Sequence, residues 1–346
     1  MKIVVTGCSG YVGTALVERL LQDDSFRVVG VDRIRTERPL GGRFSFVECD
    51  LSAPAGLLAG AAFDDVQAVI HLAAARGDWA ISASEYWRDN LAATEGLLGA
   101  PWAASVPHWL FMSSVSTYGP SNEALTEDAA CRPVGPYGES KLASERAFLE
   151  FIRRNRLRGC AIRPSAIFSA GHPNNTNVYR LIESLMRFPI PLIGGGNNRK
   201  TLTYLPNLLD LVFWCLDLMH RGEMRSEVYN YVEEPVPTVA TLIQALRHAG
   251  IRPARTVKIP LGLALAMAYP VYLLGRLTGV DLRVTPERVN KYAASTCYDA
   301  SKVKRDGFVP AVDLEAALAT TARWHLMRHA ERGAAFNASA DEAGRP

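Results

Sequence analysis

The chain has 346 residues, a length that allows two domains or one large one. Hydrophobic residues make up 48% and charged residues 21%, close to the average of globular proteins, so a disordered chain is excluded. The formal net charge is only +3, with no basic block or acidic tail, so charge gives no reason to expect a nucleic-acid partner.

Six cysteines are too few for a disulfide framework in a chain of this length, and no two of them form a CxxC pair. No histidine lies near them at the spacing of zinc ligands, so no metal site is expected. The apolar run at the N-terminus stops at Gly7, too short for the core of a signal peptide. These features predict a cytoplasmic protein with reduced thiols.

Short apolar runs alternate with helical patterns in the first half of the chain. The pattern predicts strands at Lys2–Thr6, Arg27–Val31, Phe44–Glu48, Ala68–Ala73, Trp109–Ser113 and Cys160–Arg163. It predicts helices at Tyr11–Leu21, Glu85–Ala104 and Tyr137–Arg156. Strands that are apolar on both faces and alternate with helices indicate a doubly wound parallel sheet, an α/β fold.

Prolines and glycines interrupt this alternation of strands and helices in the second half of the chain. Short strands are predicted at Leu202–Leu205, Val228–Tyr231 and Thr256–Ile259, with helices at Asn207–His220, Val239–Ala249 and Leu314–Arg332. We expect a dinucleotide-binding domain at 1–165, to which 207–235 returns. A smaller α/β substrate-binding lid domain takes 166–206 and 236–332, and 333–346 form a flexible tail.

One segment, Leu261–Gly275, is apolar throughout. It is shorter than the 18 or so residues of a membrane span, and Pro270 interrupts it, so no membrane span is expected. The segment is interpreted as a buried or subunit-contact helix, with contact to a membrane surface as the alternative.

Three glycines follow the first predicted strand and open the first helix. Gly7, Gly10 and Gly13 permit a tight turn through which the backbone can approach a pyrophosphate, which the helix N-terminus attracts. Asp32 ends the second strand, where an acid accepts hydrogen bonds from ribose hydroxyls and repels a ribose phosphate. NAD is therefore expected, although Asp32 could be a solvated turn acid, and Arg33 or Arg35 could bind the 2′-phosphate of NADP.

A YxxxK pair follows on the helix after the Trp109–Ser113 strand. Tyr137 and Lys141 share a helix face at i and i+4, so the lysine cation can stabilise the phenolate. A tyrosine tuned in this way can exchange a proton with a carbinol. Ser113 and Ser114 end the preceding strand, at the sheet edge where such folds bind ligands. A YxxxK pair alone is weak evidence, because many helices carry Tyr and Lys on one face by chance. Here the pair follows a glycine loop and a strand that ends in serines, and the three motifs in this order indicate an active site.

In these motifs the chain resembles the extended short-chain dehydrogenase/reductase family, which includes sugar-nucleotide epimerases and dehydratases on a Rossmann fold. The resemblance covers nearly all of residues 1–325. It rests on TGCSGYVG, Asp32, Cys49-Asp50-Leu51, HLAAA (71–75), Asn90 with Thr94, SSVSTYG, YGESK, IRPSAIF, LIGGGNNRKTLTYLPNLLD, VYNYVEE and YDASKVKRDGFVP.

The resemblance implies roles for these residues. Tyr137 would be the acid/base, Lys141 would tune it and bind the nicotinamide ribose, and Ser114 would hold the substrate hydroxyl. His71 would be structural, and Pro164 and Ser165 would face the nicotinamide amide. The cofactor-binding set would be Gly7, Gly10, Tyr11, Val12, Gly13, Asp32, Asp50, Leu51, Ala73, Ala74, Arg76, Asn90, Ser113, Tyr137, Lys141 and Pro164.

The substrate implied is a nucleotide sugar, UDP-linked, of surface-polysaccharide biosynthesis. Galactose epimerases of the family carry an Asn where this chain has Ala166, which argues against UDP-glucose and UDP-galactose. The cations of Arg199 and Lys200 could hold the diphosphate, or could decorate a solvated turn. Asn174 and Asn175 offer amides before a helix start, and the substrate-binding set would be Ser114, Ser116, Asn177, Arg199 and Lys200.

The implied reaction is 4-epimerisation through a keto intermediate. Dehydratases of the family carry an Asp-Glu pair after the serine, where this chain has Val115 and Ser116. The alternatives are a reductase or dehydrogenase of a keto sugar or of an apolar alcohol of the steroid or flavonoid type, and a silent NAD-binding protein. A homodimer is expected through the helices Glu85–Ala104 and Tyr137–Arg156, with four candidate contact residues that could also pack on the sheet, namely Leu142, Phe148, Leu149 and Ile152.

Overall fold

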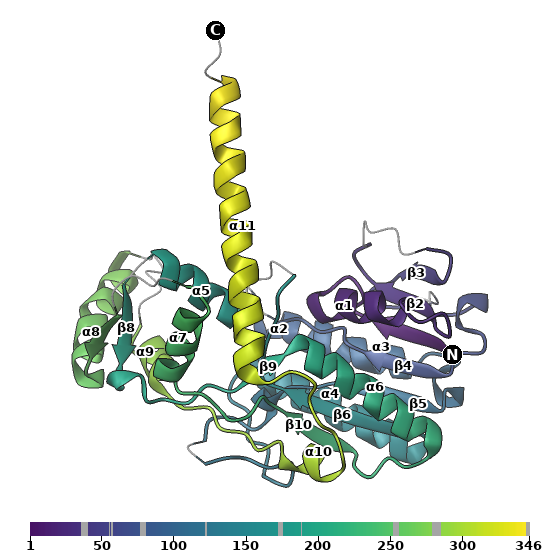
Figure 1. Ribbon diagram of the computed structural model, residues 1–346. Helices are drawn as coiled ribbons and strands as arrows, with labels where there is room; N and C mark the ends of the chain where they lie inside the picture. The colour runs from purple at the N-terminus through teal and green to yellow at the C-terminus, as the bar shows by residue number, and fades with distance from the viewer. Residues whose placement is uncertain are drawn as a thin grey trace.

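The computed structural model describes most of the chain as one α/β molecule built on a parallel sheet (Figure 1). The described residues are 1–35, 41–54, 56, 58–76, 81–121, 123–171, 176–187, 189–251, 256–278 and 285–343, with side chains up to Glu331.

The sheet has seven strands, all parallel, in the order β10-β6-β5-β4-β1-β2-β3. The order reverses between β1 and β4, which makes a crevice at the carboxyl ends of the strands the expected ligand position. The strands are β1 (Lys2–Thr6), β2 (Arg27–Asp32), β3 (Phe44–Glu48), β4 (Ala68–His71), β5 (His108–Met112), β6 (Arg158–Pro164) and β10 (Val228–Tyr231).

Helices cover both faces of this sheet. One face packs against α1 (Tyr11–Leu20) and α6 (Leu205–Arg221), and the other against α3 (Ala93–Leu98) and α4 (Pro136–Arg154). Alternate residues of one strand divide between the two cores, as in β1, where Ile3 and Val5 face α1 and α6 while Val4 faces α3 and α4. The doubly wound parallel sheet predicted from the sequence is confirmed.

The helix predicted at Glu85–Ala104 is wrong at its C-terminal end. The structure has α2 (Ala83–Tyr86), a π-helical stretch (Trp87–Ala92) and α3, which ends at Leu98. Pro101 restricts the conformation of the residue before it and lacks an N–H, so the helix cannot run through to Ala104.

A third hydrophobic core is formed mainly by α5 (Asn177–Arg187), β8 (Ile190–Ile193), α7 (Val239–His248) and the start of α11 (Leu314–Ala343). Outside this core, β11 (Thr256–Ile259) pairs with β8, and α8 (Leu261–Thr278) packs against α9 (Pro286–Ala293). We call α5, β8, α7, β11, α8 and α9 together the small lobe. β8 and β11 pair in parallel, as do β7 (Ala166–Phe168) and β9 (Leu202–Tyr204). Figure 1 shows the small lobe on the side of the molecule opposite the N-terminus. The division into two domains stays a prediction.

One further expectation differs from the structure. α11 (Leu314–Ala343) continues beyond Arg332, where the sequence predicts the helix to end, and it projects from the body in Figure 1. Ala-rich sequence favours helix even without an apolar stripe, which explains the extension. α10 (Ser301–Arg305) precedes α11 and packs beside β10.

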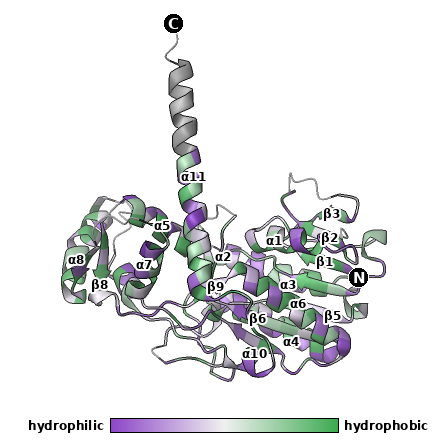
Figure 2. Cartoon of the chain, viewed as in Figure 1, coloured by the Kyte–Doolittle hydropathy of each residue, from purple (hydrophilic) through white to green (hydrophobic). Residues whose placement is uncertain are grey.

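The apolar segment at 261–275 forms most of α8, and its prediction as a buried helix is wrong. Hydrophobic residues run along the helix (Figure 2), yet only Ala264 and Ala268 are buried. The surrounding elements bury one narrow strip of small side chains and leave most of the larger ones exposed.

Three of the four residues named for a dimer contact are not available for one. Leu142, Phe148 and Ile152 are buried within the chain, and the Phe148 ring stacks on Phe111 with centroids 5.3 Å apart. Phe148 and Ile152 belong to the core on the sheet, because the apolar stripe of a covering helix faces its own core first. The homodimer itself stays a prediction.

Candidate active site

The loop between β1 and α1 is shaped by close backbone contacts. Gly7 has a left-handed φ of 67°, and a Cβ there would lie 2.7 Å from the backbone nitrogen of Ala73. A Cβ on Gly13 would lie 2.0 Å from the carbonyl oxygen of Gly7. Any larger side chain at either position would push the loop open.

The N-terminus of α1 is open to an anion. Gly10 caps the helix without a side-chain hydrogen bond, and the first turn holds no acid. The unpaired N–H groups and the positive end of the helix dipole therefore point out of the loop. This is the arrangement that binds a pyrophosphate.

Asp32 is hydrogen-bonded to this loop. Its carboxylate accepts hydrogen bonds from the backbone N–H of Ser9 at 3.0 Å and of Ile34 at 3.1 Å. The side chain is thus fixed at the carboxyl end of β2, with lone pairs left for ribose hydroxyls. Arg33 pairs instead with Asp89, its Nη1 3.1 Å from Oδ2, and the Arg35 guanidinium lies over Phe46. Neither arginine is held in place for a 2′-phosphate.

Buried polar side chains join the end of β4 to the helices behind it. Asn90, in the π-helical stretch, accepts from the N–H of Ala75 at 2.7 Å and donates to the hydroxyl of Ser140 at 2.8 Å. The ring nitrogens of His71 lie 2.6 Å from the hydroxyl of Thr6 and 3.0 Å from that of Thr94. Asn90 thereby fixes the loop after β4 against α4.

His71 has the structural role that was expected of it. Burial, and after it the charge of Lys141, lower the pKa of His71 to about 3. A histidine held neutral in this way, with both nitrogens engaged, has no proton to exchange near neutral pH.

Lys141 is buried at the carboxyl edge of the sheet. Its Nζ donates a 2.7 Å hydrogen bond to the carbonyl of Met112 and lies 4.3 Å from the ring centre of Phe111. Burial lowers the pKa of Lys141 to about 7, and the charge of Glu145 one turn later opposes that shift. The side chain therefore releases its proton more readily than a solvent-exposed lysine, and it lies directly beside the serine-tipped end of β5.

Tyr137 lies in the first turn of α4, which packs on the turn that follows β5 and Ser114. A Cβ on Gly138 would lie 2.6 Å from the carbonyl of Ser116, so the glycine of YGESK allows this approach. Tyr137 is partly exposed, with its ring 5.7 Å from that of Tyr86. The Ser114 hydroxyl accepts from the N–H of Ser116 at 3.1 Å, which leaves its own proton to donate.

The hydroxyl of Ser113 is buried and has no hydrogen-bond partner. A buried polar group without a partner costs free energy, and such groups mark sites that a ligand completes. Together with the glycine loop, the open α1 N-terminus and the fixed Asp32, this orphaned hydroxyl fits a dinucleotide lying along the carboxyl edge of the sheet.

The remaining predicted cofactor residues line the same edge. Tyr11 bonds through its hydroxyl to Ser169 at 2.7 Å, and burial raises its pKa to about 12. The Asp50 carboxylate accepts from the N–H of Ser52 at 2.9 Å, beside the buried Leu51. Val12 is partly exposed in the first turn of α1, and Pro164 is buried at the end of β6. Ala73, Ala74 and Arg76 are partly exposed or exposed in the loop after β4.

The predicted substrate residues are not brought together. Asn177 is exposed at the first position of α5, while Ser116 sits in the turn beside Ser114. Asn174 and Asn175 lie outside the described residues. Ser165, expected at the nicotinamide amide, hydrogen-bonds Thr203 through its N–H at 3.0 Å.

Arg199 and Lys200 have surroundings other than those expected of a diphosphate site. Lys200 Nζ donates to the carbonyl of Ala294 at 2.7 Å, at the C-terminal end of α9, and burial lowers its pKa. Arg199 is exposed and lines a cavity of about 550 Å³ together with Glu234, Asp299 and Lys304, and Lys304 pairs with Glu234. The two acids of this cavity offset its two cations, so it offers a diphosphate no excess of positive charge. The diphosphate contact predicted for Arg199 and Lys200 stays a prediction.

The sequence analysis did not predict a series of buried, hydrogen-bonded polar side chains behind the site. Arg163 in β6 makes a two-pronged ion pair with Glu145 of α4 and donates to the Tyr118 hydroxyl at 2.6 Å. Tyr118 in turn donates to Asn230 of β10 at 2.8 Å. The sign in the sequence was an acid one turn after Lys141, on the buried face of the helix.

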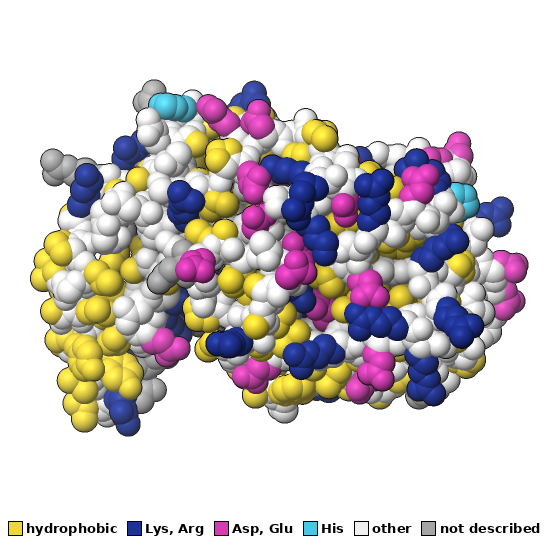
Figure 3. Space-filling model, turned by 90° about the horizontal axis from the view of Figure 1, so that it is seen from below, with side chains coloured by type: hydrophobic (Ala, Val, Ile, Leu, Met, Phe, Trp, Pro, Cys, Tyr) yellow, Lys and Arg dark blue, Asp and Glu magenta, His cyan; other side chains and the backbone are white. Residues whose placement is uncertain are grey.

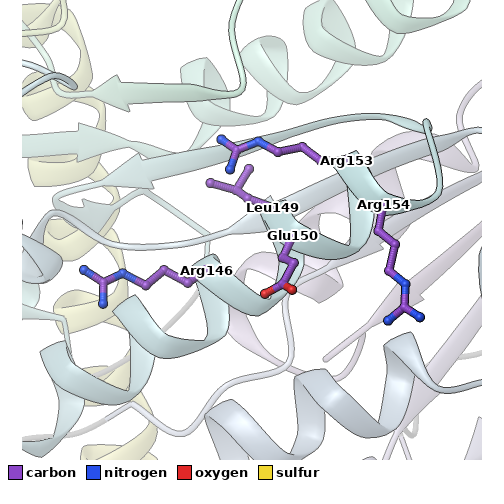
Figure 4. Close-up of a pocket in the computed structure, with 5 residues that line it drawn as sticks. All are labelled: Arg146, Leu149, Glu150, Arg153 and Arg154. Carbon is purple, nitrogen blue, oxygen red and sulfur yellow. The ribbon is translucent and has the colours of Figure 1, made fainter.

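A second hollow lies on the outer side of α4. It has a volume of about 420 Å³ and is lined by Arg146, Leu149, Glu150, Arg153 and Arg154 (Figure 4). Neither Tyr137 nor Lys141 lines it. In the described part of the chain, no group of three or more His, Cys, Asp or Glu is placed to hold a metal ion.

The chain belongs to the NAD-dependent epimerase/dehydratase family, whose sequence model matches residues 3–230. Its members are enzymes of the epimerase and oxidoreductase kind, and NAD is their cofactor. The glycine loop, the fixed Asp32 and the Ser114, Tyr137 and Lys141 cluster are the parts of this chain that fit NAD and its chemistry.

Curated relatives include 4-epimerases of two kinds. The N-acetyl-α-D-glucosaminyl-diphospho-ditrans,octacis-undecaprenol 4-epimerase of Escherichia coli is 29% identical over 334 residues, 96% of this chain and 97% of that one. The UDP-glucose 4-epimerase of Corynebacterium glutamicum is 29% identical over 216 residues, 59% of this chain and 62% of that one.

Solved structures support the same fold. The protein MoeE5 in complex with UDP-glucose and NAD is 27% identical, with a TM-score of 0.69 over 95% of this chain and 99% of that one. The UDP-glucuronic acid 4-epimerase of Bacillus cereus in complex with NAD has a TM-score of 0.71 at 21% identity, over 94% of this chain and 98% of that one.

Proposed function

We propose that this chain inverts C4 of a sugar joined to a diphosphate, through a keto intermediate. The observation that carries the proposal is the placement of Lys141, anchored on Met112 immediately before Ser113 and Ser114 and one helical turn after Tyr137. Bound NAD supplies a reversible hydride acceptor for this chemistry.

The side chains divide the work as follows. Ser114 donates its free proton to the substrate oxygen and orients it. Tyr137 takes the hydroxyl proton as the carbinol is oxidised and returns it when the ketone is reduced on the other face. Lys141 favours the phenolate because its positive charge lies on the same helix face. Val115 and Ser116 stand where a dehydratase would need two acids to expel a further hydroxyl.

A nucleotide sugar is the first candidate substrate, as the family resemblance implies. A sugar diphosphate on a polyprenol is the second. It is supported by the E. coli relative, which matches nearly the whole chain, and by α8, whose apolar side chains remain exposed in the small lobe.

The test is to incubate the purified protein with each substrate carrying deuterium at C4 of the sugar. We expect the 4-epimer to form with the deuterium retained and without accumulation of reduced cofactor, because the hydride removed is the hydride returned. Tyr137→Phe is the control. Formation of a 4-keto product, or loss of the label to solvent, would refute epimerisation.

A further inference from the structure

The burial of α8 is inverted relative to that of an ordinary surface helix. Its fully buried positions are the small Ala264 and Ala268, while most of the large side chains face solvent. Three large side chains are half-buried, namely Leu265, Val271 and Tyr272. A helix that packs on its own domain normally buries its large apolar residues. Six large side chains are exposed by between 52% and 85%, namely Leu263, Met267, Tyr269, Leu273, Leu274 and Leu277.

These side chains form most of the exposed apolar surface. Of the thirteen large hydrophobic residues that are exposed in the described part of the chain, seven belong to α8, and Val257 lies just before it. Figure 3 shows hydrophobic side chains gathered at the end of the molecule where α8 lies. A patch that concentrates the apolar surface of a protein marks a docking site.

The charge on β11 and α8 themselves is of one sign. Residues 256–278 contain Lys258 and Arg276 and no Asp or Glu, and both cations are exposed. Tyr269 and Tyr272 add aromatic rings, whose polar tips favour the headgroup zone of a bilayer. Apolar side chains flanked by cations complement an anionic lipid surface.

The arrangement of its neighbours places α8 along a membrane rather than across it. By length and composition it is the one helix among the described residues that could cross a bilayer. Its 18 residues span about 27 Å. However, β11 before it pairs with β8, and α9 after it packs back against it, so both flanks belong to the same lobe. Pro270 also leaves the carbonyl of Ala266 without its helical donor, which water at the interface can replace but lipid cannot.

We propose that α8 is a membrane-docking helix that lies in the interface of an anionic bilayer, with its large apolar side chains in the lipid and Lys258 and Arg276 at the headgroups. This inference is independent of the proposed reaction, because lipid binding is measured without turnover. A second copy of the chain is the competing occupant.

The experiment is co-sedimentation of the full chain with vesicles of phosphatidylglycerol and phosphatidylcholine in equal amounts. Wild type should bind, and Met267→Glu with Leu277→Glu should weaken binding by tenfold or more, since two charges enter the apolar face. The matched control is Met327→Glu with Val309→Glu. Met327 is 59% exposed and Val309 is 80% exposed, close to the 58% of Met267 and the 85% of Leu277. The control should bind like wild type.

Lys258→Gln and Arg276→Gln should each weaken binding by about fivefold, as expected for one cation near an anionic surface. A wild type that stays in the supernatant, or an α8 variant that binds like its control, would overturn the proposal. So would sedimentation velocity without lipid, if wild type forms an oligomer that the α8 variant lacks, because α8 would then be a contact between copies.

Discussion

The Nζ of Lys141 lies 2.7 Å from the carbonyl oxygen of Met112, so the active-site helix is pinned to the end of β5 by the charged group itself. The same nitrogen lies over the ring of Phe111, one residue earlier on that strand. The position of Lys141 relative to Ser113 and Ser114 is thereby set by the strand that carries those serines, without a flexible connection.

Tyr137→Phe should reduce turnover by about 10²–10⁴-fold, because it removes the only proton that the proposed acid/base exchanges. NAD affinity should change by less than about twofold, since the ring remains. Steady-state kinetics and calorimetric NAD titration separate the two effects. Activity within tenfold of wild type would show that another group carries the proton.

Lys141 should give the folded protein a distinctive pH dependence. Its folded pKa of about 7 lies below its ordinary value of 10.5, so between these pH values the unfolded chain binds a proton that the folded chain has released. Stability should therefore rise with pH through that window, by at most about 1.4 kcal/mol per unit.

Lys141→Met removes this contribution. The free energy of urea unfolding of the cofactor-free wild type, minus that of the variant, should increase from pH 7 to pH 9. A constant difference across that range would mean that the lysine keeps its ordinary pKa.

Ser113→Ala should separate cofactor binding from stability. Removing a buried hydroxyl that has no partner should raise the free energy of unfolding of the cofactor-free protein by about 1 kcal/mol. NAD should bind more weakly to the variant, because the cofactor would lose its hydrogen bond with the Ser113 hydroxyl. Ser114→Ala is the control: its hydroxyl accepts from Ser116, so its loss should lower both stability and turnover. Unchanged NAD affinity in Ser113→Ala would place the cofactor elsewhere.

Asp32 should set the choice between the two dinucleotides. We expect wild type to bind NAD more tightly than NADP, because the carboxylate repels a 2′-phosphate. Asp32→Asn should narrow that preference, because the amide carries no negative charge. Its oxygen can still accept from the N–H of Ser9, while the hydrogen bond from the N–H of Ile34 is lost. Tighter binding of NADP than of NAD by the wild-type protein in calorimetry would contradict this prediction and would favour Arg33 or Arg35 as a ligand of the 2′-phosphate.

Lys200 should act on stability more than on substrate. Lys200→Ala removes the donor to the last carbonyls of α9, for an expected loss of about 1–2 kcal/mol of unfolding free energy. Arg199→Ala, next to it but exposed, should leave stability within about 0.5 kcal/mol. An increase of KM above tenfold in Lys200→Ala, with unfolding unchanged, would favour the diphosphate contact instead.

Short sequence motifs predicted the parts of the site whose geometry depends on residues close together in the sequence. The strand–glycine–helix order gave the pyrophosphate loop, and the i, i+4 spacing placed Tyr137 and Lys141 on one face of α4. Asp32 was predicted for the same reason, because the end of a strand beside a glycine loop has one location in a parallel sheet.

Long-range packing decided what the sequence could not reveal. An apolar stripe shows which face of a helix is covered but not by what, so Leu142, Phe148 and Ile152 were equally compatible with a partner subunit and with the sheet. α8 is apolar all round and has no stripe to interpret. The bond from Lys200 to α9 joins residues more than ninety positions apart and leaves no local trace.

Asn230 constrains the order in which a growing chain can complete its active site. Its side chain accepts from Tyr118 and donates to the carbonyls of Leu125 and Asp299, so three distant segments meet at one buried amide. A ribosome delivers the catalytic helix α4 long before Asn230, and Asp299 later still. The glycine loop and α4 can therefore form early during synthesis, whereas the support behind Tyr118 forms only after nearly nine-tenths of the chain has been made.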